Sequence, residues 1–562
     1  MIRKNMKNKI EKRKMMKRVF TGFILLAMVA VLTVGCSVDK TLDKEAAKEN
    51  VTVNEVRTKE IEQIVMCQSR DLFGSGNLTP VTQGGWEGVY YLANFYETLV
   101  NYEQGEIVPG LAETWEVNGN EITFKLKEGV KFSDGADFNA AVVKNNIEQI
   151  PELIGSVMVS TYSVLSKLKE VQVLDDYTVK LILKEPYYGA LQELTMVWPM
   201  GMMSPHAFTS TGISAQVDSQ TLGTGPYQLD SFVKGHQYTF IRNDHYWGEQ
   251  PAIKQFIVKI IPDMASRIMA LRAGEIDIIV GSNNITYDAF AEFADEQKFT
   301  AKVSDSIIKT NAVLLNTTRM PFNNKNVRLA VQHAIDKEVI CDKILYGIEE
   351  KADALLSTEL PYCDVVLEPY LYDPVKAKKL LTQAGWELPA GSDIRKKAGQ
   401  SLEVELLFKS GVGMLEDLAM VVAEQLKTVG FKIKVTGVEG MSYFGRAVAG
   451  DFTILIYDTF GIPYDPQITI NSMASQSWNQ AAQEGVSVKP AIDAKVRELF
   501  TTIEDNKIQE HYDYILKTLH EEALYVPISY AKELVIFNNQ LIEDYRFNGQ
   551  PSNVDVIGIV PN

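Results

Sequence analysis

The residues best suited to catalysis or metal binding are few in this chain and widely separated. Its six histidines stand at positions 206, 236, 245, 333, 511 and 520, and none lies four residues from another. The HExxH zinc motif, the GxSxG nucleophile elbow and the GxxxxGK[ST] phosphate loop are all absent from the sequence. We therefore expect no enzyme, although the sequence leaves open a Ser/His/Asp site assembled from distant residues.

The four cysteines, Cys36, Cys67, Cys341 and Cys363, include no CxxC pair, so we expect no thiolate zinc site. An oxidising compartment would permit a disulfide between Cys341 and Cys363, but their spacing leaves this pairing open. Cys36 stands apart from the others because it closes an apolar segment near the N-terminus.

That segment, residues 17–36, reads KRVFTGFILLAMVAVLTVGC and has the pattern of an export signal. Its apolar run, 19–34, is shorter than the roughly 20 residues that a membrane-spanning helix needs. Nine Lys and Arg residues and one Glu precede the run, and such positive flanks stay on the cytoplasmic side. The ending Val34-Gly35-Cys36 resembles a bacterial lipobox, with Thr33 where that motif usually has Leu.

A lipobox implies a signal peptide over residues 1–36, cleavage before Cys36 and a lipid on its thiol. The alternative is an uncleaved N-terminal membrane anchor. Both interpretations predict an extracytoplasmic protein that is held at the cell membrane, on the periplasmic side or at the cell surface. Residues 37–56 are polar and nearly free of aromatic residues, which predicts a flexible tether, although the segment KEAAKE would also suit a helix.

The net charge excludes two classes of partner. The whole chain carries −16, and removing the first 36 residues, with nine positive charges and one negative, changes this to −24. So acidic a protein is not expected to bind nucleic acid or to lie flat on anionic lipid. No second run of 18 apolar residues occurs, so we do not expect a permease.

The residues after Cys36 are enough for two large lobes or three medium domains. Alternating segments at 122–127 and 179–184 predict strands. A helix is predicted over 373–385, which starts with Asp-Pro and ends with Gly. Similar periodic patterns predict helices over 326–346, 414–429 and 492–524. Strands that alternate with helices predict an α/β fold.

Most of the chain between residues 61 and 542 resembles the extracytoplasmic solute-binding proteins of peptide and nickel ABC importers, known as family 5. The longest such segment is YETLVNYEQGEIVPGLAETWEVNGNEITFKLKEGVKFSDGADF at 96–138. Further segments follow in the family's order at 223–227, 243–248, 270–279 and 314–337. Within the family, this chain most resembles the nickel-binding members, in its segments 384–406, 460–466 and 520–530.

The resemblance implies a type II periplasmic-binding-protein fold, in which two lobes close on a ligand without changing it chemically. Lobe I would comprise residues 57–281 and 531–562, with an extra domain inserted at about 85–215. Lobe II would comprise residues 282–530, and the chain would cross between the lobes near Gly281 and Tyr530. Ligand contacts to both lobes would favour the closed form, which the permease would recognise.

The same resemblance implies where the ligand lies. Peptide-binding relatives hold the ligand's amino terminus with an Asp where this chain has Ile462, which argues against ordinary peptides. Nickel-binding relatives pair an Arg with a carboxylate of the metal's chelator, and a His can bind the metal. The matching positions in this chain are Trp198 for the Arg and Trp478 for the His. The matching aromatic positions around the ligand are Phe444, Phe460 and Tyr464.

The expected pocket is therefore strongly aromatic, with Trp86 or Tyr90 as a further wall. Such a lining suits a flat organic ligand or a cation held over ring faces. Arg446 is the nearest charged candidate; a surface position is expected for it, but it could also pair with a ligand carboxylate. The methionines expected to fill the core instead are Met196, Met202 and Met203.

The expected function is that of a substrate-binding lipoprotein of an ABC importer that captures nickel as a small chelate. The alternative is a receptor for oligopeptides or another organic solute on the same scaffold. The expected partners are the cognate permease and ATPase complex, a small-molecule ligand and, through Cys36, the cell membrane. We expect a monomer, no nucleic-acid partner and no cofactor besides the transported nickel chelate.

Overall fold

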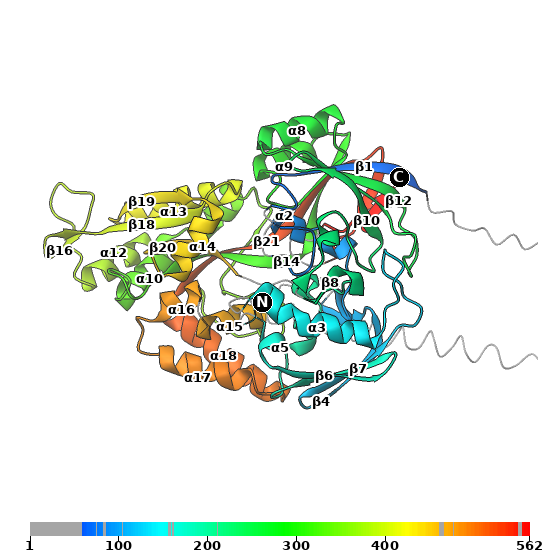
Figure 1. Ribbon diagram of the computed structural model, residues 1–562. Helices are drawn as coiled ribbons and strands as arrows, with labels where there is room; N and C mark the ends of the chain where they lie inside the picture. The colour runs from blue at the N-terminus through cyan, green and yellow to red at the C-terminus, as the bar shows by residue number, and fades with distance from the viewer. Residues whose placement is uncertain are drawn as a thin grey trace, which may run out of the picture. The chain divides into compact units, whose positions relative to one another are not determined.

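Two long strands, β14 (Phe299–Leu315) and β21 (Tyr525–Asn538), run side by side through the centre of the computed structural model (Figure 1). The structure describes residues 59–562 except 75, 83–85, 104, 156–158, 160–161, 211, 460–465, 476 and 549–553. The predicted signal peptide, Cys36 and the predicted tether all lie outside the described residues.

Both long strands belong to an 11-stranded sheet with the order β10-β11-β12-β1-β13-β21-β14-β20-β18-β19, to which β15 adds on β21. On one side of the long pair, β1 runs parallel to β12 and β13; on the other side, β18 runs parallel to β19 and β20. The bounds are β1 (Ile61–Gln68), β10 (Tyr227–Val233), β11 (Gln237–Arg242), β12 (Ile253–Ile260), β13 (Ile278–Val280), β15 (Glu350–Lys351), β18 (Glu403–Lys409), β19 (Lys432–Val438) and β20 (Ile454–Asp458).

The pairing of β14 with β21 is interrupted in the middle. Residues 299–303 pair with 534–538, and residues 307–314 pair with 525–532, with register shifts between 303 and 307 and between 307 and 309. Such irregularities bend a strand pair and increase its twist. The lobe boundaries expected near Gly281 and Tyr530 are not tested by this pairing and stay predictions.

Helices pack on both groups of parallel strands and complete a mixed α/β fold, as predicted. Figure 1 shows α8 (Met264–Ala273) and α9 (Tyr287–Ala294) beside β1, and α13 (Gly413–Thr428) beside β18 and β19. Buried side chains from these helices and from α10 (Lys325–Ala334) and α12 (Pro374–Gln383) form one hydrophobic core with the strands. This core contains residues of both strand groups.

The end signals of α12 explain why its position was predictable. The Asp373 carboxylate accepts a hydrogen bond from the backbone nitrogen of Lys376 at 2.9 Å, and Pro374 occupies the first turn. Gly385, with a φ of +85°, follows the last turn in a conformation that glycine adopts without strain. The helix predicted over 414–429 is confirmed as α13.

Two other predicted helices are each interrupted. The helix expected over 326–346 stops at Ala334, because Ile335 is extended and Asp336 starts a new short helix, α11 (Lys337–Val339), by accepting from the backbone nitrogen of Val339. The helix expected over 492–524 is in fact α17 (Lys489–Leu499) and α18 (Asp505–Glu521). Periodicity predicted both as continuous because apolar residues recur with helical spacing across each break.

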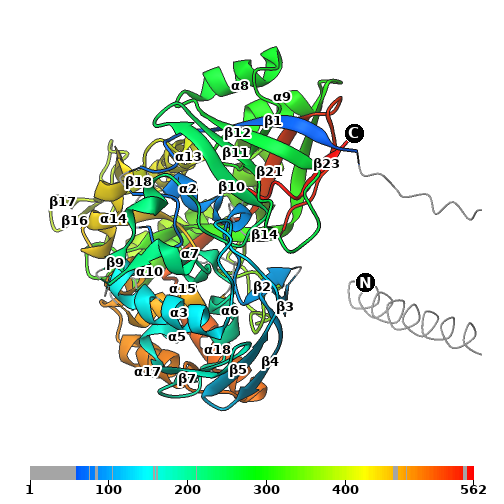
Figure 2. The same ribbon diagram turned by 45° about the vertical axis from the view of Figure 1, so that its right-hand side comes forward.

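A second, antiparallel sheet has the order β4-β5-β7-β6 and lies beside α3 (Ala140–Ile154) in Figure 2. Its strands are β4 (Ala112–Asn118), β5 (Glu121–Leu126), β6 (Leu168–Asp175) and β7 (Thr178–Leu183), which confirms the strands predicted at 122–127 and 179–184. The hydroxyls of Tyr188 and Tyr512 lie 2.9 Å apart, so α18 contacts the segment that follows β7.

Shorter elements complete the described chain. Among the described residues, no helix is both long enough and apolar enough to span a membrane. The remaining elements that bear on the site are α2 (Trp86–Val89), α5 (Ser163–Ser166), α7 (Val197–Met200), α14 (Gly440–Val448), α15 (Pro466–Ala474) and α16 (Trp478–Gln483).

Candidate ligand-binding site

The carboxyl ends of the two groups of parallel strands approach each other. Arg70 follows β1, and Gly411 follows β18. A Cβ atom added to Gly411 would lie 3.4 Å from Nη2 of Arg70, so the two segments are in contact. In α/β folds, ligands bind outside the carboxyl ends of parallel strands, which makes this region the candidate site.

An ion pair lies at this edge where β20 ends. Nζ of Lys309, on β14, stands 2.9 Å from Oδ2 of Asp458, the last residue of β20. Burial disfavours the charged form of Lys309, but attraction to the Asp458 carboxylate outweighs burial and raises the pKa of the ammonium. Lys309 therefore stays protonated near neutral pH and is held by the Asp458 carboxylate.

Tyr90, one of the predicted wall residues, lies close to the same ion pair. Burial and, to a lesser extent, the charge of Glu87 raise the pKa of its hydroxyl to about 12, while Lys309 opposes them. Tyr90 therefore stays neutral, and its side chain is partly exposed. Its role in ligand binding stays a prediction.

Lys409, the last residue of β18, is a site residue that the sequence did not single out. Its Nζ lies 5.5 Å from the centre of the Phe444 ring, close enough for a cation–π contact. Burial lowers the pKa of this ammonium, the Asp458 carboxylate opposes that effect, and Arg70 lowers the pKa further. Among the described residues, no carboxylate forms an ion pair with Lys409, in contrast to Lys309.

Two of the predicted aromatic residues are brought together beside Lys409. Phe444, on α14, is 37% exposed, and its ring centre lies 6.0 Å from that of Trp478. Trp478 is the first residue of α16, and the side chain of Ser477 caps that helix by accepting from the backbone nitrogen of Gln480 at 3.3 Å. The cap fixes where α16 begins and so holds the indole near Phe444.

Trp198 lies in a different environment. Its side chain is 8% exposed, its Nε1 donates to the backbone oxygen of Thr82 at 3.0 Å, and its ring meets the edge of Tyr162 at 5.8 Å. Its indole nitrogen is therefore engaged by the chain itself. Trp198 supports the segment that leads to α2, and its predicted contact with the ligand stays a prediction.

Arg446, the predicted charged candidate, is held by two carboxylates. Its Nη2 lies 2.6 Å from Oε2 of Glu405, and its Nε lies 3.1 Å from Oδ2 of Asp451. These partners raise the pKa of the guanidinium and neutralise its charge. A ligand carboxylate would have to compete with both of them.

The remaining predictions fall into two groups. Phe460, Ile462, Tyr464 and the side chain of Trp86 lie outside what the structure describes. The core positions expected for three methionines are confirmed, since at most 3% of each is exposed. These are Met196, Met202 and Met203.

The three cysteines of the described chain are buried thiols, so the disulfide left open between Cys341 and Cys363 does not form in this structure. Burial raises the pKa of Cys341 to about 12. No group of three His, Cys, Asp or Glu residues suited to a metal ion occurs among the described residues.

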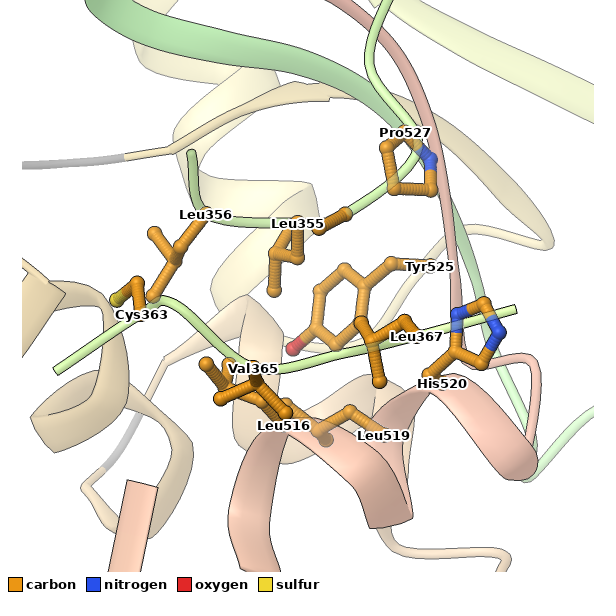
Figure 3. A pocket seen from close by; sticks show the side chains of 11 residues that line it. Leu355, Leu356, Cys363, Val365, Leu367, Leu516, Leu519, His520, Tyr525 and Pro527 are labelled. Atoms are coloured by element: carbon orange, nitrogen blue, oxygen red, sulfur yellow. The ribbon is translucent and has the colours of Figure 1, made fainter. Parts of the chain in front are cut away.

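A small apolar cavity lies away from the predicted site residues. Figure 3 shows the Tyr525 ring between the segment that carries Leu355 and Leu356 and helix α18, which contributes Leu516 and Leu519. The cavity holds about 20 Å³, room for a single water molecule. None of the predicted site residues lines it, and it is too small for an organic ligand.

Comparison with known proteins gives this geometry a context. The model of the family described as Bacterial extracellular solute-binding proteins, family 5 Middle, matches residues 106–481. A nickel-binding periplasmic protein of Escherichia coli K12 is 35% identical and covers 79% of this chain and 85% of its own length. A dipeptide-binding protein of the same organism is 26% identical and covers 82% of this chain and 87% of its own. The crystal structure of NikA from Brucella suis in complex with Fe(III)-EDTA matches with a TM-score of 0.83 and 33% identity, over 89% of this chain and 100% of that chain.

These matches confirm the predicted two-lobed type II fold. Members of the family bind solutes outside the cytoplasm for ABC importers and are not enzymes, so the prediction that this chain is no enzyme is also confirmed. The chain is most similar in sequence, among the proteins named here, to the nickel-binding protein, and it belongs to the family 5 bacterial extracellular solute-binding proteins.

Proposed function

We propose that this protein is a lipid-anchored receptor that captures nickel as a small organic chelate and delivers it to the permease of an ABC importer. The observation that carries the proposal is the pair of Phe444 and Trp478 beside Lys409, at the carboxyl ends of the parallel strands. Ring faces and an adjacent cation suit the flat organic part and the carboxylates of a metal chelate. The similarity to a nickel-binding protein supports the metal.

The chelator would supply the donor atoms for nickel. Trp478 stands at the position where nickel-binding relatives can provide an imidazole, and an indole ring does not ligate nickel. The chelator's donors would therefore stay on the metal, and the protein would recognise the organic surface of the complex. This agrees with a related structure that holds a metal as its EDTA complex.

Closure of two lobes would accompany capture. The irregular pairing between residues 303 and 309 of β14, opposite residues 531–534 of β21, is the natural place for the bend between lobes. Contacts across this bend, such as that between Arg70 and Gly411, would form only in the closed state. A ligand that adds contacts on both sides would shift the population toward closure, which the permease and its ATPase would then recognise.

Attachment to the membrane would depend on Cys36. Cleavage before this cysteine and lipidation of its thiol would keep the receptor beside its permease, with residues 37–56 as the tether. Metabolic labelling with a fatty-acid analogue tests this directly: the intact chain should take up label and the Cys36→Ser variant should not.

Ligand titration of the full-length chain, purified in mild detergent, tests the transport assignment. Nickel with excess L-histidine should raise the unfolding temperature and change tryptophan fluorescence, and dialysis followed by metal analysis should find one nickel per chain. A response to a peptide pool together with no response to any nickel chelate would overturn the nickel assignment. That result would favour the alternative, an oligopeptide or other organic solute, for which the 26% identity to a dipeptide-binding protein is the support.

A further inference from the structure

Two cations from opposite strand groups stand at the candidate site. Lys409 ends β18, and Arg70 follows β1 and reaches Gly411, two residues beyond Lys409. Arg70 is among the charges that lower the pKa of Lys409. Like charges at such positions repel, and an anion between them would relieve that repulsion.

Neither cation is fully neutralised by the described residues around it. Arg70 is half exposed, and its Nη1 lies 3.7 Å from Oε1 of Glu87, a loose ion pair. Lys409 has the Phe444 ring at 5.5 Å and feels the Asp458 carboxylate, but Asp458 is already paired with Lys309 at 2.9 Å.

Further carboxylates act on this cluster, since Glu349 raises the pKa of Lys309 and Glu533 raises that of Tyr90. The unbalanced positive charge is therefore local to two side chains: Lys409, which forms no ion pair with a described residue, and Arg70, whose pair with Glu87 is loose. In a chain whose residues after Cys36 carry −24, two such cations beside an exposed aromatic ring favour a ligand with an ionised carboxylate.

We infer that Lys409 and Arg70 form a two-sided clamp for a carboxylate of the ligand, with one cation from each strand group. The inference deepens the proposed function and rests on it: the carboxylate would belong to the metal's chelator. Because the clamp needs both cations, a carboxylate bound between them would also favour closure of the two lobes.

A pair of chelators, compared across protein variants, isolates the contact to the carboxylate. Histidine and histamine offer nickel the same imidazole and amine donors, but only histidine has a carboxylate, which can also bind nickel. That difference between the two complexes is the same for every variant, so the part of the preference that a substitution removes measures the contact to the protein. A charge-assisted hydrogen bond contributes enough that its loss weakens binding about 10- to 100-fold. The full-length chain should therefore bind nickel with L-histidine about 10- to 100-fold more tightly than nickel with histamine.

Four variants test which residues set this preference. Lys409→Met and Arg70→Met should each lose most of the preference for histidine over histamine, whereas Lys409→Arg should retain it because it keeps the charge. Lys432→Met is the matched control, because Lys432 forms an exposed ion pair with Glu403, the first residue of β18, at the opposite end of that strand from Lys409. Unfolding temperatures recorded without ligand show that each variant is folded before its affinity is compared.

The outcomes separate the clamp from the proposed function. If the unmodified chain binds nickel–histidine and Lys409→Met keeps both the affinity and the preference, the clamp is overturned while the nickel receptor stands. If no nickel chelate binds, the proposed function fails, and peptides with free or amidated carboxyl ends then test the clamp alone. Preference for the free carboxyl end, lost in Lys409→Met, would support the clamp, and equal binding of both peptide forms would overturn it.

Discussion

Lys409 and Arg446 lie near the same pair of elements, β18 and α14, but in opposite electrical surroundings. Arg446 is held between Glu405 and Asp451, and these carboxylates neutralise its charge. Lys409 stands over Phe444 and shares its nearest carboxylate, Asp458, with Lys309. The comparison teaches that a charged residue becomes a candidate ligand anchor through the partners it lacks as much as through its position in the sequence.

The largest expected effect comes from removing the aromatic ring of Trp478, which lies beside Phe444. Trp478→Ala should weaken binding of nickel–histidine about 30-fold or more, because a large ring in a binding site contributes about 2 kcal/mol or more. Isothermal titration measures the affinity. Trp247→Ala is the control, since Trp247 is 39% exposed and bonds to Glu97 in another region. Equal losses of affinity in both variants would show that Trp478 has no special role in ligand binding.

Substitution of the two cations tests the comparison itself. Lys409→Met should weaken binding of nickel–histidine about 10-fold or more, since an ionic contact to the ligand is lost. Arg446→Met should change the affinity less than about twofold, because its charge is already neutralised by two carboxylates. The reverse order of effects would make Arg446 the anchor and would refute the distinction drawn between the two residues.

The ion pair at the end of β20 should affect stability more than affinity. Lys309→Met should lower the free energy of unfolding by about 1 kcal/mol, because the lysine is largely buried while Asp458 is about half exposed. Urea denaturation measures this change. Lys325→Met, which breaks an exposed pair with Glu522, should cost about 0.5 kcal/mol or less. Similar costs for both variants would show that the Lys309 pair is no better shielded than a surface pair.

The smallest effect is expected at the contact between the strand ends. Gly411 and Gly399 both have positive φ, +80° and +82°, so alanine at either position should cost about 1 kcal/mol of stability. Only at Gly411 would the added Cβ meet Arg70, while Gly399 has open space. Gly411→Ala should therefore also weaken ligand binding by a few-fold, and Gly399→Ala should not. An equal effect of both variants on affinity would argue against this contact as part of closure.

Much of the fold could be predicted because its signals are local. The Asp-Pro start and Gly end of α12 are adjacent in sequence, and alternation within six residues identified β5 and β7. The breaks at Ile335 and after Leu499 could not be predicted, because apolar periodicity continues across both while side-chain caps and tertiary packing decide the backbone.

The candidate site was predictable only in part, for a related reason. Resemblance to a family pointed to Phe444 and Trp478, which the structure brings to 6.0 Å. Lys409 and Arg70 gave no signal, because each is an ordinary charge after a strand until the fold places the two strand ends against each other. Arg446 was singled out by its position; its partner Asp451 is only five residues away, but Glu405 comes from a separate element, β18.

Metal analysis of the full-length chain after dialysis against nickel, with and without L-histidine, tests the central claim most directly. The account predicts one nickel per chain when histidine is present and none with nickel alone, because the chelator supplies the donors and the carboxylate. Nickel retained without any chelator, or no nickel retained with histidine, would contradict it.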